Sequence, residues 1–419
     1  MLTHHLMSGI AAAGSGVVSV PFGSLFVAAG DSITDNGAAE SSSIANGNGR
    51  GYWQWVMQGA RGRIMPVYQA DAGVTGNQTG DLWARYAADV TSKNPKIVLL
   101  LIGTNDVING RTADYILGYI DLMLAANRAI GAVTVMGRIL PRGSVGSPMN
   151  GSQITAWEGA NAGISARAAP DIKVWDVEAI IGNMDAAHTM KTGYSDSGDF
   201  LHPNTRCGYE IAVNGPLPII NSLIASGDNL FTTNNAAGNL IPNGFMTGTG
   251  GVNVGTTGQL ATGWVGDTSQ TGGALMAVSK AARGDGYGEW QQFAMSGTYT
   301  GSGRAGLIYA ANTFSVLAGQ RIRLSADFEI DAGHLQFAAM GVRAVVGPYS
   351  IESLVAFGGE TAEVNGSGAI SGIIRTMPFQ LSANQTAFAI YIRPQLLDVG
   401  SLTACSVVGR IGRLELKVV

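Results

Sequence analysis

The sequence predicts an α/β domain with a parallel sheet, followed by an all-β sandwich domain. Three observations point to this division of the 419 residues. A chain of this length exceeds one ordinary domain. Up to about residue 226, short apolar runs alternate with helical periodicity, which is typical of a parallel sheet covered on both faces. Near Gly227 the helical period ends, and short strand-like runs separated by turn residues follow.

The first half should contain five buried strands and four main helices. The expected strands are residues 25–29, 64–69, 97–102, 132–136 and 172–175, all short and apolar. The expected helices are 81–90, 112–130, 154–168 and 205–224. Helix 112–130 has apolar residues at i, i+3 and i+4 spacing, the pattern of a helix packed on a sheet. The aromatic run at 52–55 favours a helix core over a substrate cleft.

The second half should be built from strands at 321–330, 335–345, 369–377, 386–392 and 410–417. Residues 228–305 are crowded with Gly, Asn, Thr and Ser and carry little charge. These features predict an N-terminal segment at 1–23, an α/β domain at 24–227, a linker at 228–239 and a β-sandwich at 240–419.

The composition excludes several classes of function. Only 13% of the residues are charged and the net charge is -4, which gives no electrostatic footprint for nucleic acid. Cys207 and Cys405 are far apart and have no metal-ligand spacing, so neither a metal site nor a disulfide framework is expected. No uninterrupted apolar run of membrane-spanning length occurs. The start lacks the basic region of a secretory signal, and we expect an extracellular or virion-associated protein, with a cytoplasmic one still open.

A candidate nucleophile follows the first strand. The run Gly30-Asp31-Ser32 places a hydroxyl at the carboxyl edge of the predicted sheet, where ligands bind in open α/β sheets. A helix cap is the alternative interpretation of these residues. A serine hydroxyl is a weak nucleophile unless a base removes its proton, so a catalytic Ser32 requires a histidine.

Two histidines have an aspartate three residues earlier, which could hold the imidazole in one tautomer. They are His188, after Asp185, and His202, after Asp199. His202 precedes a predicted helix packed on the sheet, whereas His188 precedes a predicted surface loop. The context therefore favours His202.

An acyl-transfer serine also needs hydrogen-bond donors for the oxyanion that develops on the carbonyl. The strand at 97–102 runs into Gly103-Thr104-Asn105-Asp106, and the strand at 64–69 runs into a loop that contains Gly73 and Gly76. Both loops fall at the same sheet edge as Ser32. They could supply a side-chain amide and a main-chain N–H.

Together these blocks resemble the SGNH, or GDSL-type, hydrolases over roughly residues 24–226. The resemblance implies a three-layer, flavodoxin-like fold and ester hydrolysis through an acyl-serine, without a metal or cofactor. It implies Ser32 as nucleophile, His202 as base and Asp199 as its orienting group. The oxyanion would be bound by the N–H groups of Ser32 and Gly76 and by Asn105, with Gly73 as the alternative to Gly76.

The substrate is less determined by the sequence, because this family accepts acetylated sugars, short acyl esters and lipids. Residues 239–245 and 262–264 resemble the start of jelly-roll-like carbohydrate-binding modules. Trp264, Tyr287 and Trp290 could stack on sugar rings, the alternative being that they fill the sandwich core. We therefore expect a carbohydrate O-acetyl esterase that acts on acylated carbohydrate or a small ester. The alternatives are a general short-chain esterase or lipase, and an inactive binding module such as a phage tail component; homo-oligomerisation stays open.

Overall fold

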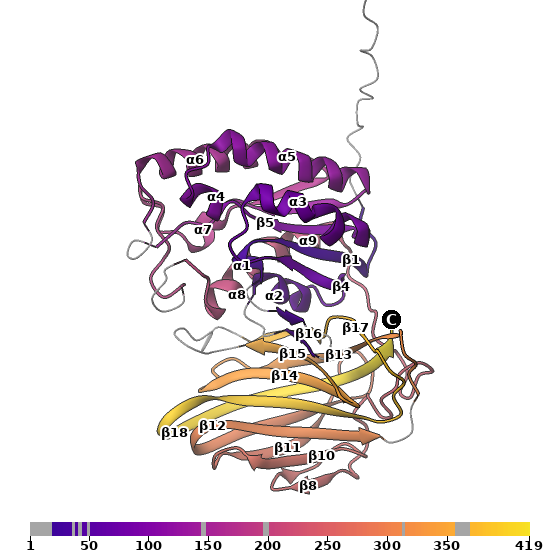
Figure 1. Ribbon diagram of the computed structural model, residues 1–419. Coiled ribbons are helices and arrows are strands. Elements are labelled where there is room, and N and C mark those ends of the chain that lie inside the picture. The colour runs from indigo at the N-terminus through magenta and orange to yellow at the C-terminus, as the bar shows by residue number, and fades with distance from the viewer. Residues whose placement is uncertain are drawn as a thin grey trace, which may run out of the picture.

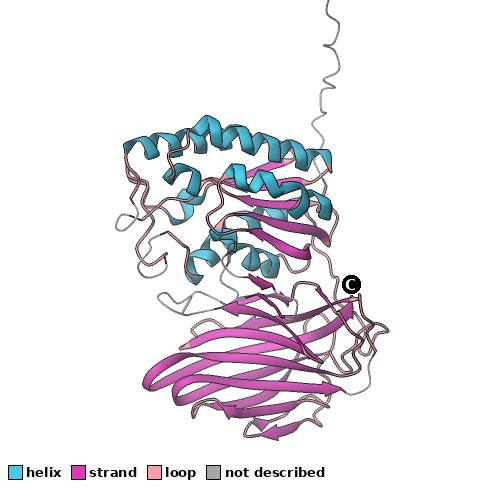
Figure 2. Cartoon of the chain, in the orientation of Figure 1, coloured by secondary structure: helices cyan, strands magenta, loops and turns pink. Residues whose placement is uncertain are grey.

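The fold consists of an α/β unit followed by an all-β unit, in the predicted order (Figure 1). The computed structural model describes residues 19–35, 38–40, 44–47, 51–143, 148–195, 201–311, 315–356 and 369–419. All helices of these residues belong to the first unit, and the second consists of strands and loops (Figure 2). Within the described ranges, no helix is both long and apolar enough to cross a membrane.

The first unit is built on a five-stranded sheet whose strands are all parallel. Its order β4-β1-β5-β6-β7 corresponds to 2-1-3-4-5 along the chain, the flavodoxin-like order. The bounds are β1 Ser24–Gly30, β4 Ile64–Gly73, β5 Ile97–Leu101, β6 Val133–Gly137 and β7 Ile172–Trp175. The residues of β5 and β6 are buried throughout, because helices cover both faces of the sheet. All five predicted strands are confirmed.

The helices form two layers, one on each face of the sheet (Figure 1). Helices α3, α4, α5 and α6 pack together on one face, and α2, α7, α8 and α9 on the other. Their bounds, with those of the short α1 and a 3-10 turn η1, are α1 Ser32–Asp35, α2 Tyr52–Gly59, α3 Thr79–Asp89, η1 Thr91–Lys93, α4 Thr104–Ile108, α5 Ala113–Ala129, α6 Gly151–Ala166, α7 Val177–Ile181, α8 Thr205–Asn214 and α9 Pro216–Leu223.

Polar side chains cap the starts of α5 and α6, and α6 begins at Gly151, before the expected residue 154. Thr112 accepts a hydrogen bond from the Tyr115 N–H at the start of α5, and Asn150 forms a capping box with Gln153 at the start of α6. The aromatic run of α2 is buried, so its interpretation as helix core is confirmed.

The single helix expected at 205–224 is in fact two helices. α8 ends at Asn214, and α9 begins at Pro216. Proline has no main-chain N–H to donate and is favoured at the first position of a helix, so it starts a new helix instead of continuing the old one.

The second unit is a 13-stranded sheet folded into a sandwich. Its strands are β8 Val252–Val254, β9 Thr257–Gly258, β10 Val265–Gln270, β11 Leu275–Ala282, β12 Glu289–Ala311, β13 Arg321–Ile330, β14 Phe337–Val346, β15 Tyr349–Ala356, β16 Ile370–Arg375, β17 Phe379–Gln380 and β18 Phe388–Val418, with β2 Ala38–Glu40 and β3 Ile44–Gly47 added from the first unit. Cys207 and Cys405 are buried free thiols.

Strands β12 and β18 take part in both layers of the sandwich. The start of β12 pairs with β11 and with the end of β18, whereas the end of β12 pairs with β10 and with the start of β18. Their mutual ladder shifts register between Tyr299 and Arg304. The predicted strands 386–392 and 410–417 are therefore the two ends of one strand. The expected break between them was wrong, because the intervening residues stay hydrogen-bonded to β12.

The two units are joined by main-chain pairing as well as by the linker. Strand β3 adds to β15 in parallel and β2 pairs with β3, so residues 38–40 and 44–47 lie in the sheet of the second unit. Next to it, α2 packs on β16, and Gln58 of α2 donates to the Leu354 carbonyl of β15 at 3.1 Å. A Cβ atom at Gly372 would come within 2.7 Å of the Gln58 carbonyl oxygen, so this close approach requires glycine.

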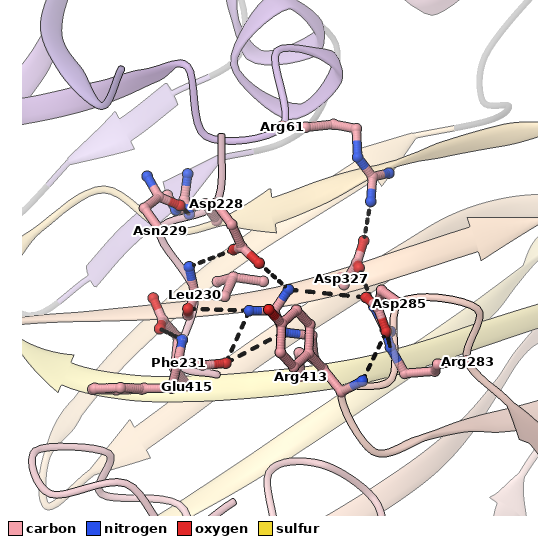
Figure 3. Close-up of polar contacts among 12 residues, drawn as sticks. Arg61, Asp228, Asn229, Leu230, Phe231, Arg283, Asp285, Asp327, Arg413 and Glu415 are labelled. Carbon is pink, nitrogen blue, oxygen red and sulfur yellow. Dashed lines mark hydrogen bonds and ion pairs between the residues drawn. The ribbon is translucent and has the colours of Figure 1, made fainter. Parts of the chain in front are cut away.

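A buried ion-pair network lies at the same junction (Figure 3). The carboxylate of Asp327 on β13 accepts from Arg283 at 2.7 Å and from Arg61 of the first unit at 2.9 Å. Both Asp327 and the Arg283 side chain are almost fully buried, whereas Arg61 is 42% exposed. Arg283 also binds Asp285 at 2.5 Å. Removing a buried charge from such a network leaves its partner in a medium of low dielectric constant.

The linker residues extend this junction. Arg413 donates to Asp228 at 2.6 Å and to the carbonyl oxygens of Leu230 and Phe231 at 3.0 and 2.9 Å. Asn229 donates to the Gly62 carbonyl at 3.1 Å. Residues 228–231 of the linker are therefore hydrogen-bonded to Arg413 of the second unit and to Gly62 of the first.

We expect Asp327→Ala to lower the free energy of unfolding by about 3 kcal/mol, because it leaves Arg283 buried beside one carboxylate only. Asp89→Ala, which removes a surface ion pair with Arg85, should change it by less than about 1 kcal/mol. Urea unfolding of both variants measures the difference. Equal small losses would show that the Asp327 network does not stabilise the junction.

Candidate active site

Ser32 begins the short helix α1 directly after β1, and its neighbour Asp31 acts as the cap. The Asp31 carboxylate accepts from the Ile33 N–H at 3.0 Å. The Asp31 carbonyl accepts from the N–H groups of Thr34 and Asp35 at 3.1 and 3.0 Å. Because Asp31 satisfies the first turn, the Ser32 hydroxyl is available for another partner.

That partner is His202. The Nε2 atom of His202 lies 2.8 Å from the Ser32 Oγ, a normal hydrogen-bond distance, and both residues are partly exposed. A neutral imidazole in this position can accept the hydroxyl proton as the serine attacks an electrophile. The structure thus brings together two residues that are 170 positions apart in the sequence.

The start of α8 holds His202 in place. Asn204 caps this helix by accepting from the Cys207 N–H at 3.0 Å. Its side-chain NH₂ group donates to the carbonyl groups of Gly193 and Ser195 at 2.9 and 3.2 Å. Asn204 therefore ties the loop that carries His202 to the preceding loop. The predicted third residue, Asp199, lies outside the described residues, and its role stays a prediction.

Asp31 is a carboxyl group of this site to which the sequence assigned no role. It is 1% exposed. Burial raises the pKa of Asp31 to about 7; the bond from the Ile33 N–H and the charge of His202 lower it, and the charge of Asp106 raises it. Asp31 therefore shares the electrostatic environment of His202. The one sequence signal for this was its position next to Ser32.

The loop after β4 offers a main-chain N–H at Gly76. In the sheet, Gly30 at the end of β1 lies opposite Gly73 of β4, so this loop starts at the level of Ser32. The Gly73 N–H donates to Asp71 at 2.8 Å, which favours Gly76 over Gly73 as a donor. Gly76 has a φ of +80° in a turn closed by Asn77, and no hydrogen bond of its N–H occurs within the described residues. This left-handed conformation favours glycine.

The loop after β5 places Asn105 at the same edge. Leu101 also lies opposite Gly30. Asn105 Nδ2 donates to the Asn77 carbonyl at 3.0 Å, so the side-chain amide faces the loop that contains Gly76.

Asp106 links the loop after β5 to Thr79 at the start of α3. It is fully buried and accepts from the N–H of Thr79 at 2.9 Å and from its hydroxyl at 2.6 Å. Burial raises the pKa of Asp106, and the two bonds from Thr79 lower it in part. Asp106 therefore joins the loop after β5 to Thr79, where the loop after β4 ends. These two loops carry the candidate oxyanion donors Asn105 and Gly76.

The second Asp–His pair of the sequence has a different environment. His188 Nδ1 lies 2.6 Å from Glu178 and Nε2 lies 3.1 Å from Glu158, and the ring stacks on Trp157 with centroids 4.1 Å apart. The Asp185 carboxylate instead accepts from the N–H of the residue after His188, at 2.9 Å. Burial lowers the pKa of His188, but its bonds to the two glutamates outweigh this and raise it. These contacts describe a structural histidine.

The aromatic residues expected to stack on sugar lie under other side chains. Trp264 is 1% exposed and Trp290 is 8% exposed. The guanidinium of Arg283 covers the Trp290 ring at 3.8 Å from its centroid, and Arg413 covers Tyr287 at 4.4 Å. These rings therefore pack within the second unit, and none of the three forms an open platform for a sugar. The core interpretation fits Trp264 and Trp290, which are buried, and cation–π contacts already use a face of the Trp290 and Tyr287 rings.

The sequence itself was compared with known proteins. Residues 28–211 match the model of the GDSL-like lipase/acylhydrolase family. The match covers less than half of the chain, and over this segment the chain is similar to that family. The match includes Ser32, Gly76, Asn105 and His202 and ends before the β unit, so the likeness of that unit to carbohydrate-binding modules has no support from this comparison.

An acetylxylan esterase from Geobacillus stearothermophilus is 37% identical over 86 residues. The aligned part is 19% of this chain and 37% of that esterase, little more than a third of its length. Among solved structures, a catalytic mutant of an acetylxylan esterase from the same organism is 19% identical, covers 50% of this chain and 100% of its own, and has a TM-score of 0.40. A GDSL-like lipase from Bacteroides thetaiotaomicron is 18% identical, covers 48% and 88%, and has a TM-score of 0.36.

The buried Asp31 makes stability depend on pH. Its pKa is about 7 in the folded protein against a usual value of 3.8, so the folded state keeps a proton that the unfolded state releases. The wild type should therefore lose stability between about pH 4 and pH 7. The side chain of Asp31→Asn does not ionise. The unfolding free energy of this variant should therefore exceed that of the wild type by an amount that increases between about pH 4 and pH 7, to at most about 4 kcal/mol, and stays constant at higher pH.

Urea unfolding of the wild type and Asp31→Asn at a series of pH values tests this. Asp89→Asn, a change at the surface, serves as the control and should run parallel to the wild type. An Asp31→Asn curve that also runs parallel to the wild type would show that Asp31 ionises normally.

Proposed function

We propose that this protein is a serine esterase that removes acyl groups, chiefly O-acetyl groups, from carbohydrate through an acyl-serine intermediate. The observation that carries the proposal is the 2.8 Å distance between His202 Nε2 and Ser32 Oγ. A histidine at this distance can act as the base that a serine nucleophile requires. The GDSL-like lipase/acylhydrolase match of residues 28–211 supports the same reaction class.

In the proposed first half-reaction, Ser32 Oγ attacks the ester carbonyl carbon while His202 Nε2 takes the hydroxyl proton. The carbonyl π electrons move to the oxygen, and the N–H groups of Ser32 and Gly76 with Asn105 Nδ2 stabilise that oxyanion. When the tetrahedral intermediate collapses, the C–O bond to the sugar breaks. The leaving sugar oxygen takes the proton from His202, which leaves an acyl-serine.

In the second half-reaction, water attacks the acyl-serine and gives its proton to His202. Collapse of the second tetrahedral intermediate releases the carboxylic acid and returns the proton to Ser32 Oγ. We assign Asp199 the role of holding His202 in the required tautomer and stabilising the imidazolium. The negative charge that Asp31 carries when ionised would add to that stabilisation.

Carbohydrate is the proposed substrate class for one specific reason. The partial sequence relative is an acetylxylan esterase, which by its name acts on an acetylated polysaccharide. A lipase or a short-chain esterase would use the same Ser32 and His202, so the substrate assignment needs its own experiment.

Acetate release from acetylated polysaccharides and from p-nitrophenyl acetate tests both parts. Ser32→Ala should reduce kcat on p-nitrophenyl acetate by about 10⁴-fold or more, whereas Ser222→Ala, which changes an exposed serine of α9, should leave it unchanged. Wild-type activity that survives in Ser32→Ala would contradict the mechanism. Cleavage of p-nitrophenyl acetate but of no polysaccharide would contradict the carbohydrate assignment and favour a general esterase.

Asn105→Ala should lower kcat by about 10²- to 10³-fold with little change in KM, because an oxyanion donor acts mainly in the transition state. Asn214→Ala, which removes an exposed amide of α8, is the matched control. Steady-state kinetics on p-nitrophenyl acetate measures both variants. A loss that appears only in KM would place Asn105 in ground-state binding.

A further inference from the structure

A pocket lies at the junction between the two units, away from Ser32. Its volume is about 600 Å³, within the range of small-molecule sites. One wall comes from β1 and β4 of the first unit and the other from β13 of the second. Leu25 of this wall lies near the start of β1, roughly 16 Å along the strand from Gly30 at the catalytic edge. The pocket is therefore distinct from the candidate active site.

The walls of this junction pocket are positively charged. Lys93, Arg321 and Arg323 line it, and no acidic side chain does so among the residues that the structure describes. The protein as a whole has a net charge of -4, so three cations around one cavity stand out against the average surface. Such a cavity attracts anions by its local field.

Arg323 is the unusual member of this group. It is 6% exposed, and its Nε atom is buried without a hydrogen-bond partner in the described part of the chain. Burial lowers the pKa of Arg323 to about 9; the charge of Arg375 also lowers it, and Glu415 offsets this in part. Since a buried guanidinium nitrogen without an acceptor is unfavourable, and Arg323 also lines the cavity, Arg323 is the first candidate for an anion partner there.

Lys93 and Arg321, the other two cations, also line the pocket. Lys93 Nζ donates to the Gln69 carbonyl at 2.6 Å, which holds the ammonium group at the rim. Arg321 lies over the ring of Tyr68 at 4.4 Å from its centroid and donates through Nε to Gln380 at 3.3 Å. These contacts orient the Arg321 and Lys93 side chains at the pocket wall.

The rest of the wall includes apolar side chains. Pro66, Val67 and Pro378 line the pocket, together with Tyr68, whose ring Arg321 covers on one face. Apolar C–H surface of this kind suits the face of a sugar ring, while its oxyanion substituent would pair with the guanidinium groups. A bare inorganic anion would leave most of the 600 Å³ unused.

We propose that the junction pocket binds an anionic sugar, that is, a saccharide unit carrying a carboxylate or phosphate group. Arg323 is the main anion partner, Lys93 and Arg321 support it, and the wall of Pro66, Val67 and Pro378 contacts the sugar ring. The site is a binding site and not a catalytic one. It does not rest on the proposed esterase activity, because neither Ser32 nor His202 takes part.

Isothermal titration calorimetry of the full chain tests this proposal. The probes are glucuronate, glucose 6-phosphate, glucose and inorganic phosphate, and the two sugar anions distinguish the carboxylate from the phosphate. We expect at least one sugar anion to bind more than about tenfold tighter than glucose or phosphate alone, and more weakly at high salt.

The variants Arg323→Met and Lys93→Gln should each weaken that binding by about tenfold or more, since each removes a charged hydrogen-bond donor. Lys96→Gln, an exposed lysine on the same segment that does not line the pocket, is the matched control and should bind like the wild type. All three variants should keep wild-type activity on p-nitrophenyl acetate, and Arg323→Met should fold, because it removes a buried charge.

Three results would overturn the proposal. One is the absence of binding by either sugar anion. The second is binding that neither Arg323→Met nor Lys93→Gln weakens. The third is inorganic phosphate that binds as tightly as the sugar anions, which would leave an anion site without sugar recognition. Lys93 is at the rim, so its variant keeps the test decisive even if Arg323→Met does not fold.

Discussion

The parallel register of three neighbouring strands is the constraint on which the candidate site depends. Gly30 of β1 lies opposite Gly73 of β4 and Leu101 of β5, so the three loops that follow start at one level of one edge. β1 is the strand where the order reverses, and in open α/β sheets that position opens a crevice for ligands. Ser32, Gly76 and Asn105 lie at the same edge because main-chain hydrogen bonds between β1, β4 and β5 set the register of the strands that precede them.

Two buried carboxyl groups turn this edge into a defined site. Asp31 caps the turn that presents Ser32, and Asp106 binds the loop after β4 to the loop after β5 through Thr79. Burial raises the pKa of both. Such an arrangement lowers stability at neutral pH, and perturbed carboxyl groups of this kind are concentrated at functional sites.

The second unit is attached by more than the linker. Strands β2 and β3 leave the first unit just after α1 and add to β15, while Arg61 reaches the buried Asp327 of β13. Residues 38–40 and 44–47, which follow α1, are thus part of the second unit's sheet. The same junction contains the cationic pocket of Arg323, so the contact between the units creates a cavity that neither unit forms alone.

Much of the α/β fold and of the site could be predicted from the sequence, because both depend on local signals. Apolar runs mark all five strands, and Ser32, Asn105 and His202 follow strands or precede a helix in short motifs. What could not be predicted depends on distant partners. The pairing of β3 with β15, the continuity of β18 along β12, and the arginines over Trp290 and Tyr287 have no local signal. Pro216 did carry a local signal, a helix start, yet the apolar period across 205–224 concealed it.

The proposed reaction requires that His202 activates Ser32 as a nucleophile. Treatment with p-nitrophenyl diethyl phosphate, followed by peptide mass mapping, tests it most directly, since an activated serine forms a stable phosphoryl adduct. We expect one adduct, on Ser32, which is absent in Ser32→Ala and forms at least about 10²-fold more slowly in His202→Ala. An unmodified Ser32, or a Ser32 that reacts equally fast without His202, would contradict it.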